Sequence, residues 1–129
     1  MEEGVYSAWE EWLNQSDYDF ETAQAMFKSE RMVYVVFFCH LSIEKILKSL
    51  WVKKNNSVPP KTHNLIFLVE RLQILGTEYQ DFLSDLNQLS IPTRYPESLR
   101  KLTKELSHDK VLQFMNNTRN TLVWLKSLI

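Results

Sequence analysis

The chain has 129 residues, a length that favours one domain with a sizeable buried core. Its fifteen basic and sixteen acidic residues nearly cancel, which excludes a general attraction to nucleic acid or anionic membranes, so any such binding requires a local patch. The single cysteine, Cys39, excludes disulfides within the chain and zinc clusters, and two glycines with four prolines are too few for the turns of an all-β fold.

Residues 5–27 are predicted to form the first helix. Apolar residues recur there at steps of three and four, the spacing of one buried helical face. They are Val5, Trp9, Trp12 or Leu13, Phe20, Ala23 and Phe27. The other face carries acidic residues that we expect to be solvated, namely Glu10, Glu11, Asp17, Asp19 and Glu21.

Residues 31–54 are the most apolar stretch of the chain and are predicted to form a helix enclosed by the others, with Cys39 buried and unreactive. Polar residues within such a helix need partners, because burying them unpaired is costly. His40, Glu44 and Lys48 are each four residues apart and therefore project from one face. Two interpretations remain open: this row faces a ligand or partner, or Glu44 is simply held by its two neighbours.

The segment after residue 54 contains tandem prolines and is predicted to be an extended loop. Thr62 is expected to cap a third helix, with His63 and Asn64 in its first turn and Gly76 just after its end. The apolar face of this helix comprises Leu65, Leu68 or Val69, Leu72 and Leu75.

A fourth helix is predicted over residues 78–89, ending before Pro92. Pro96 favours the start of a short helix that continues to residue 105. Ser107 is expected to cap the last helix. Its apolar face comprises Val111, Met115, Thr118, Leu122, Leu125 and Ile129.

These elements predict an all-α fold, an up-and-down four-helix bundle with one or two additional short helices, forming a single domain over residues 1–129. The acidic N-terminus and the absence of a long apolar span lead us to expect a cytoplasmic protein without a membrane segment. Glycines occur only at positions 4 and 76, which excludes glycine-rich phosphate loops. Phosphate would then be bound by arginines such as Arg94 or Arg100 and by helix N-termini.

Four stretches in order resemble the HEPN family, the "higher eukaryotes and prokaryotes nucleotide-binding" domain. They are Asp19 with Ala23, HLSIEKILKSLW from His40, PPKTHNL from Pro59, and Arg94-Tyr95-Pro96. The resemblance covers about residues 8–128. It implies a helical bundle that usually dimerises and is often paired with a minimal nucleotidyltransferase in a two-component system of the toxin-antitoxin kind.

Our leading hypothesis is a non-enzymatic protein that binds a nucleotide, such as ATP, or a nucleic-acid phosphate, and that requires no metal or cofactor. The groove residues expected from it are Glu44, Lys45, Lys48, His63, Asn64, Arg94 and Tyr95. In this interpretation Arg94 grips phosphate, His63 donates a hydrogen bond, and Tyr95 stacks on a base or packs as a lid.

Two alternatives remain beside this interpretation. Many HEPN proteins resemble metal-independent ribonucleases, with an arginine followed after four to six residues by a histidine. Seven residues separate Arg100 from His108 here, so this pair departs from the motif but is the candidate if RNA is cleaved. The second alternative is a structural bundle without a ligand, in which Glu44 and Arg94 pair across the bundle. Aromatic residues that either form a dimer patch or belong to the core of one chain are Trp9, Trp12, Phe37 and Phe38.

Overall fold

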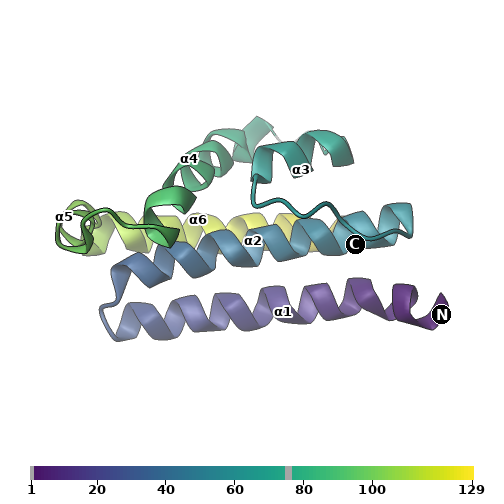
Figure 1. The fold of residues 1–129 in the computed structure, drawn as a ribbon, viewed down its shortest axis with the longest axis horizontal. Helices are drawn as coiled ribbons and strands as arrows, with labels where there is room; N and C mark the ends of the chain where they lie inside the picture. The colour runs from purple at the N-terminus through teal and green to yellow at the C-terminus, as the bar shows by residue number, and fades with distance from the viewer. Residues whose placement is uncertain (1, 75–76) are drawn as a thin grey trace.

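The computed structural model describes residues 2–74 and 77–129, and within these ranges the chain forms six helices and no strand. The helices are α1 (Glu2–Lys28), α2 (Met32–Asn55), α3 (Leu65–Leu72), α4 (Thr77–Arg94), α5 (Leu99–Glu105) and α6 (His108–Lys126). The long helices α1, α2 and α6 lie roughly parallel to one axis of the molecule, and α3 and α4 form a layer above α2 (Figure 1). The predicted all-α bundle is confirmed.

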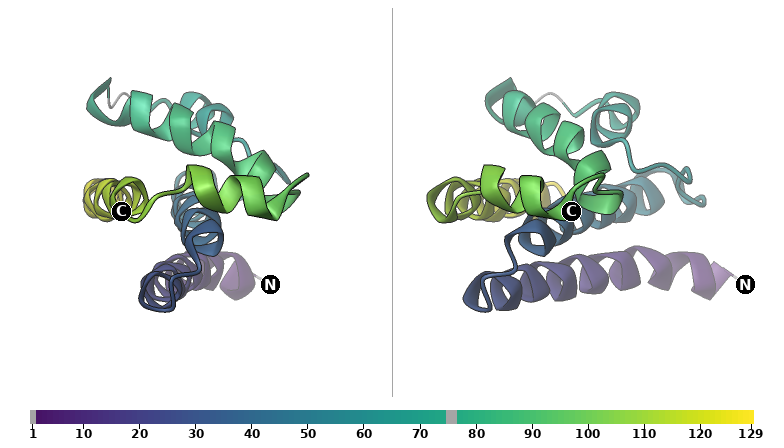
Figure 2. Two further views of the ribbon diagram at one scale, coloured as in Figure 1. Left: turned by 90° about the vertical axis from the view of Figure 1, so that its left-hand side faces the viewer. Right: turned by 60° about the vertical axis from the view of Figure 1, so that its left-hand side comes forward.

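Helix α2 is the centre of the bundle. Viewed end-on, it has α1 on one side, α6 on another and the α3–α4 layer on a third (Figure 2). Val35, Ile43 and Leu47 are completely buried as a result. Apolar residues on every side of a helix require such an enclosed position. The bounds of α2 differ from the predicted range by one residue at each end.

Small polar residues let α1 and α2 approach closely. The Ser16 hydroxyl on α1 donates to the Ser42 carbonyl at 2.7 Å, and the Ser49 hydroxyl on α2 donates to the Trp9 carbonyl at 2.6 Å. Each bond joins a short side chain of one helix directly to the backbone of the other. Larger residues at these positions would force the two helices apart.

Asp19 is buried in this contact, so its predicted exposure to solvent is wrong. Its Oδ2 atom lies 2.8 Å from Nζ of Lys45, which projects from α2 towards α1. An ionised carboxylate is tolerated in such a position when an opposite charge reaches it. The position of Asp19 is therefore determined by a residue of another helix.

The third helix begins later than predicted. Asn64, and not Thr62, is its N-cap: Asn64 Oδ1 accepts a hydrogen bond from the Phe67 amide at 3.1 Å. The Thr62 hydroxyl accepts one from the Asn64 amide at 3.1 Å and so shapes the turn before the cap. His63 and Asn64 thus precede the helix and do not lie in its first turn.

The described part of α3 ends at Leu72, followed by Gln73 in the left-handed conformation with φ of 57°. Gln73 therefore terminates the helix, as was predicted for Gly76. Leu75 and Gly76, which were predicted at the end of this helix, lie outside the described residues.

Helix α4 continues through Pro92 to Arg94, although it was predicted to end before the proline. Proline lacks an amide donor and so removes one bond of the helix. The Thr93 hydroxyl donates to the carbonyls of Leu89 at 2.9 Å and Ser90 at 3.2 Å, which adds hydrogen bonds around the same turn. As a consequence, Arg94 is carried by a helix end and not by a loop.

The last two helices have serine caps. Ser98 Oγ accepts from the Lys101 amide at the start of α5, and Ser107 Oγ accepts from the Lys110 amide at the start of α6, each at 3.2 Å. The cap predicted at Ser107 is confirmed. None of the described helices combines the length and apolarity needed to cross a membrane.

Cys39 is fully buried in α2, as predicted. Burial raises the pKa of its thiol to about 12, because the thiolate would lose its hydration. The thiol therefore stays protonated at neutral pH and does not supply a nucleophile.

Candidate functional site

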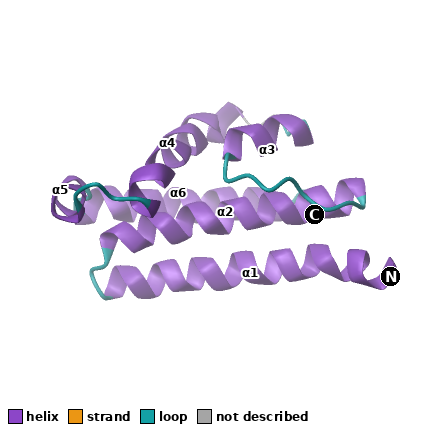
Figure 3. Cartoon of the chain, in the orientation of Figure 1, coloured by secondary structure: helices purple, strands orange, loops and turns teal. Residues whose placement is uncertain are grey.

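The loop between α2 and α3 brings His63 to the middle of α2. The chain leaves the end of α2 and runs back over the same helix before α3 begins (Figure 3). Pro59 and Pro60 lie in this segment and favour an extended backbone. Arg94 reaches the same place from the end of α4, so residues distant in sequence meet above one turn of α2.

Glu44 is the residue on which these side chains converge. Its Oε2 atom accepts a hydrogen bond from Lys48 Nζ at 3.0 Å, and its Oε1 atom accepts one from His63 Nδ1 at 2.9 Å. Arg94 Nη2 lies 3.5 Å from the same Oε1, and His40 Nδ1 lies 3.9 Å from it. We refer to His40, Glu44, Lys48, His63 and Arg94 as the Glu44 cluster.

The charges of the cluster do not cancel. Glu44 is 3% exposed and supplies one negative charge, whereas Lys48 and Arg94 supply two positive charges. One positive charge is left over before the two histidines are counted. The cluster opens to solvent at His63, whose side chain is 60% exposed, and at Arg94, whose side chain is 16% exposed. This edge presents cationic and hydrogen-bonding groups to the outside.

Asn87 of α4 forms hydrogen bonds beside the cluster, and this role was not predicted from the sequence. Its Oδ1 accepts from the Leu65 amide at 2.9 Å, and its Nδ2 donates to Asn64 Oδ1 at 3.0 Å. His40 Nε2 lies 3.5 Å from the same Asn87 oxygen. Asn87 thus connects α4, the cap of α3 and the polar row of α2.

These contacts determine the proton position on His40. Asn87 presents its oxygen, because that oxygen already accepts from the Leu65 amide, so His40 Nε2 carries the proton. His40 Nδ1 then bears a lone pair and has no hydrogen-bond partner among the described residues. Burial lowers the pKa of His40 from 6.5 to about 4, against the opposing effect of the Glu44 carboxylate. His40 is therefore neutral at pH 7.

The low pKa of His40 makes stability depend on pH. Between pH 6.5 and 4 the unfolded chain binds a proton at His40 that the folded chain does not, so stability is full above pH 6.5 and falls as the pH falls. We expect a loss of about 3 kcal/mol from this residue across that window. Urea unfolding measured from pH 7 to pH 4 tests this: His40→Gln should show a smaller loss than wild type. Equal losses in both proteins would contradict it.

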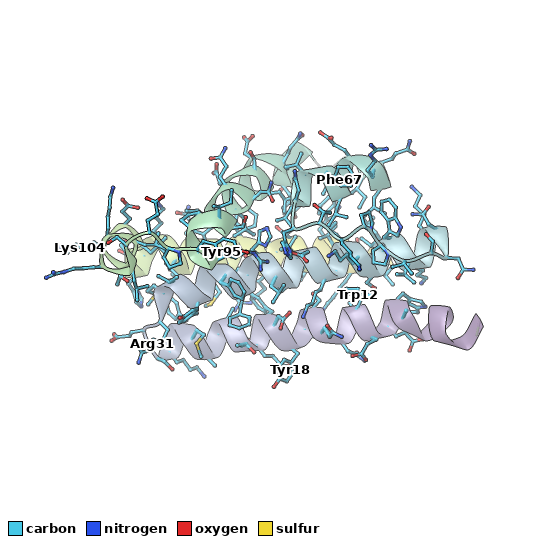
Figure 4. All side chains as sticks on the ribbon, viewed as in Figure 1. Trp12, Tyr18, Arg31, Phe67, Tyr95 and Lys104 are labelled. Atoms are coloured by element: carbon cyan, nitrogen blue, oxygen red, sulfur yellow. The ribbon has the colours of Figure 1, made fainter. Side chains whose placement is uncertain are left out.

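The other groove residues expected from the sequence lie at different distances from the cluster. Asn64 joins it through Asn87, as described above. Lys45 does not join it, because Lys45 is paired with Asp19 on the α1 side of α2. Tyr95 follows Arg94 directly and is 74% exposed, and Figure 4 shows it at the surface near the end of α4.

Arg94 also has an aromatic neighbour. Its guanidinium carbon lies 4.8 Å from the centre of the Phe37 ring, a cation–π geometry. Phe37 in turn contacts Phe38 edge-on, and Trp9 and Trp12 lie under Lys53 and Lys48. The aromatic residues suggested for a dimer patch therefore all have contacts within one chain.

The alternative pair Arg100 and His108 lies apart from the Glu44 cluster. Both residues are exposed, and no hydrogen bond or ion pair joins them in the described part of the chain. The His108 ring packs on Phe27 with 4.7 Å between ring centres, and its Nδ1 lies 3.7 Å from Asp109. Residues 2–74 and 77–129 also contain no group of three histidine, cysteine or acidic side chains arranged to hold a metal ion.

Comparisons with known proteins agree with this fold. The chain is similar to the crystal structure of TT1696 from Thermus thermophilus, with a TM-score of 0.84 and 17% sequence identity over 95% of this chain and 99% of that chain. Likeness at this level of identity shows the fold alone. No curated protein matches the chain. A model of the HEPN domain matches residues 9–128, nearly the whole sequence, and the protein therefore belongs to the HEPN domain family.

Proposed function

We propose that this protein binds the phosphate of a nucleotide or nucleic acid at the open edge of the Glu44 cluster. The observation that carries the proposal is that His63 and Arg94, from two different elements, contact the same oxygen of a buried carboxylate. Their polar groups are thereby held side by side at the surface. The surplus positive charge of the cluster favours an anion there.

The two residues differ in how firmly they are held. A separation of 3.5 Å is the outer limit for a hydrogen bond, so Arg94 is attracted to Glu44 mainly by charge and can turn its fork towards a phosphate. Lys48 keeps Glu44 neutralised when this happens. Lys48 itself is buried, so it contributes its charge rather than a direct contact.

The His63 ring is oriented by its contact with Glu44, in which Nδ1 donates to Oε1 at 2.9 Å. The side chain is 60% exposed, so the rest of the ring is accessible to a phosphate oxygen from solvent. His63 therefore offers a second polar contact beside Arg94.

Titration calorimetry with ATP tests this proposal. We expect saturable binding at pH 7. His63→Ala should bind more weakly, because it removes one of the two polar groups at the open edge of the cluster. Absence of binding to wild type, or an identical response of the variant, would contradict the proposed site.

Membership of the HEPN family supports the wider role. In the proposal, the protein forms a homodimer in the cytoplasm and works with a minimal nucleotidyltransferase in a two-component system of the toxin-antitoxin kind. Co-purification with a nucleotidyltransferase encoded beside it tests the partner, and light scattering tests the homodimer. A ribonuclease role gains no support from the geometry of Arg100 and His108.

A further inference from the structure

A hollow of about 540 Å³ lies next to the Glu44 cluster and shares Arg94 with it. Its walls are largely aromatic, with Tyr34, Phe37 and Phe38 contributed by α2 and Tyr95 by the segment after α4. Tyr34 is 49% exposed and Tyr95 is 74% exposed. Exposed aromatic rings beside an arginine are typical of surfaces on which flat ligands stack.

Arg94 gives this hollow a polar feature. The guanidinium lies over Phe37, and its Nη2 atom faces Glu44. Its Nε atom is buried and has no hydrogen-bond partner among the described residues. The Thr93 hydroxyl, also in the wall, already donates to carbonyls of its own helix. A ligand in the hollow would therefore meet Arg94 through its charged guanidinium nitrogens and not through the buried Nε.

We infer that the hollow receives the base of the nucleotide whose phosphate is bound by His63 and Arg94. The inference rests on the proposed function and deepens it. Arg94 belongs both to the phosphate site and to the wall of the hollow. The distance between the two is therefore no greater than the length of one arginine side chain, which is suitable for the phosphate and the base of a single nucleotide.

The occupant is therefore a free nucleotide or an unpaired nucleotide of a single strand. A nucleobase has a flat face for Tyr34 and Tyr95 and acceptor atoms for Arg94. Inorganic polyphosphate lacks the ring, and the bases of a duplex are stacked inside the helix and cannot enter the hollow.

The test compares ATP with inorganic tripolyphosphate by titration calorimetry. We expect ATP to bind wild type about tenfold more tightly, since stacking of one base contributes on that scale. Tyr95→Ala should lose most of this difference while its affinity for tripolyphosphate stays unchanged. Tyr95→Phe, which keeps the ring, should stay close to wild type. Tyr18→Ala is the matched control, because Tyr18 is an exposed tyrosine on the outer side of α1 (Figure 4).

Several results would overturn the inference. Equal affinity for ATP and tripolyphosphate would show that the hollow does not bind the base, although the phosphate site would still be supported. If Tyr95→Ala changes the sedimentation of the protein but not its affinity for ATP, the hollow is a contact surface for a second copy of the chain. If wild type binds neither ligand, the proposed function and this inference fail together.

Discussion

Replacing Glu44 with glutamine is expected to destabilise the folded protein by about 3 kcal/mol, because it removes the partner of a buried charge. Lys48 is buried and its ammonium group is paired with Glu44 at 3.0 Å. His63 and Arg94 lose the same carboxylate. The free energy of unfolding in urea at pH 7 measures the effect.

Two further variants identify its origin. Glu10→Gln removes an exposed acid of α1 and should change stability by no more than about 0.5 kcal/mol. Lys48→Met combined with Glu44→Gln should recover part of the loss, since the unpaired buried ammonium is then absent. A Glu44→Gln protein as stable as wild type, or a double variant with fully additive losses, would show that the buried pair does not hold the cluster together.

Asn87→Ala is expected to cost about 2 kcal/mol, because it removes the acceptor of the amide of the buried residue Leu65 and of the buried His40 ring. The Leu65 amide, at the start of α3, loses its acceptor at 2.9 Å, and the Asn64 side chain loses a donor at 3.0 Å. Thermal or urea unfolding measures the change. Gln88→Ala, at the next and exposed position of α4, is the matched control and should be close to neutral.

The same substitution has a local consequence. Without Asn87, the cap of α3 is no longer connected to α4, so protection of the first amides of α3 from hydrogen exchange should fall more than that of α2. Uniform loss of protection across both helices would contradict a local role for Asn87.

The sequence predicts the helices best where one local pattern decides the structure. Residues of α2 are apolar on all sides, which allows only an enclosed helix, and its predicted bounds agree with the structure within one residue. Helix α4 shows where local rules are insufficient. Pro92 predicts an end, but hydroxyl groups of the same turn supply additional bonds, and the helix continues to Arg94.

The candidate site illustrates the same division. Spacing alone places His40, Glu44 and Lys48 on one face of a helix. His63 and Arg94 lie 19 and 50 residues from Glu44 in the sequence. Their contact with Glu44 was expected only from the family resemblance. Asn87 carried no signal, because an asparagine inside a helix acquires its role only when Asn64 and Leu65 are placed beside it.

A ligand site and a structural role are compatible here. Glu44 stabilises the bundle through Lys48, and it holds His63 and Arg94 at the surface through its other oxygen. Loss of stability alone therefore does not distinguish the two roles. Variants at the open edge of the cluster are more informative than variants at its buried centre.

The central claim is that Arg94 binds phosphate at this edge, and titration calorimetry with ATP on Arg94→Ala tests it most directly. The variant should retain wild-type helicity by circular dichroism and bind ATP at least about tenfold more weakly, since one charge-assisted hydrogen bond to phosphate contributes about 1.5 kcal/mol or more. Arg100→Ala, which removes an exposed arginine of α5, should bind as wild type does. Equal affinity of wild type and Arg94→Ala, or a loss confined to Arg100→Ala, would contradict the assignment of the site.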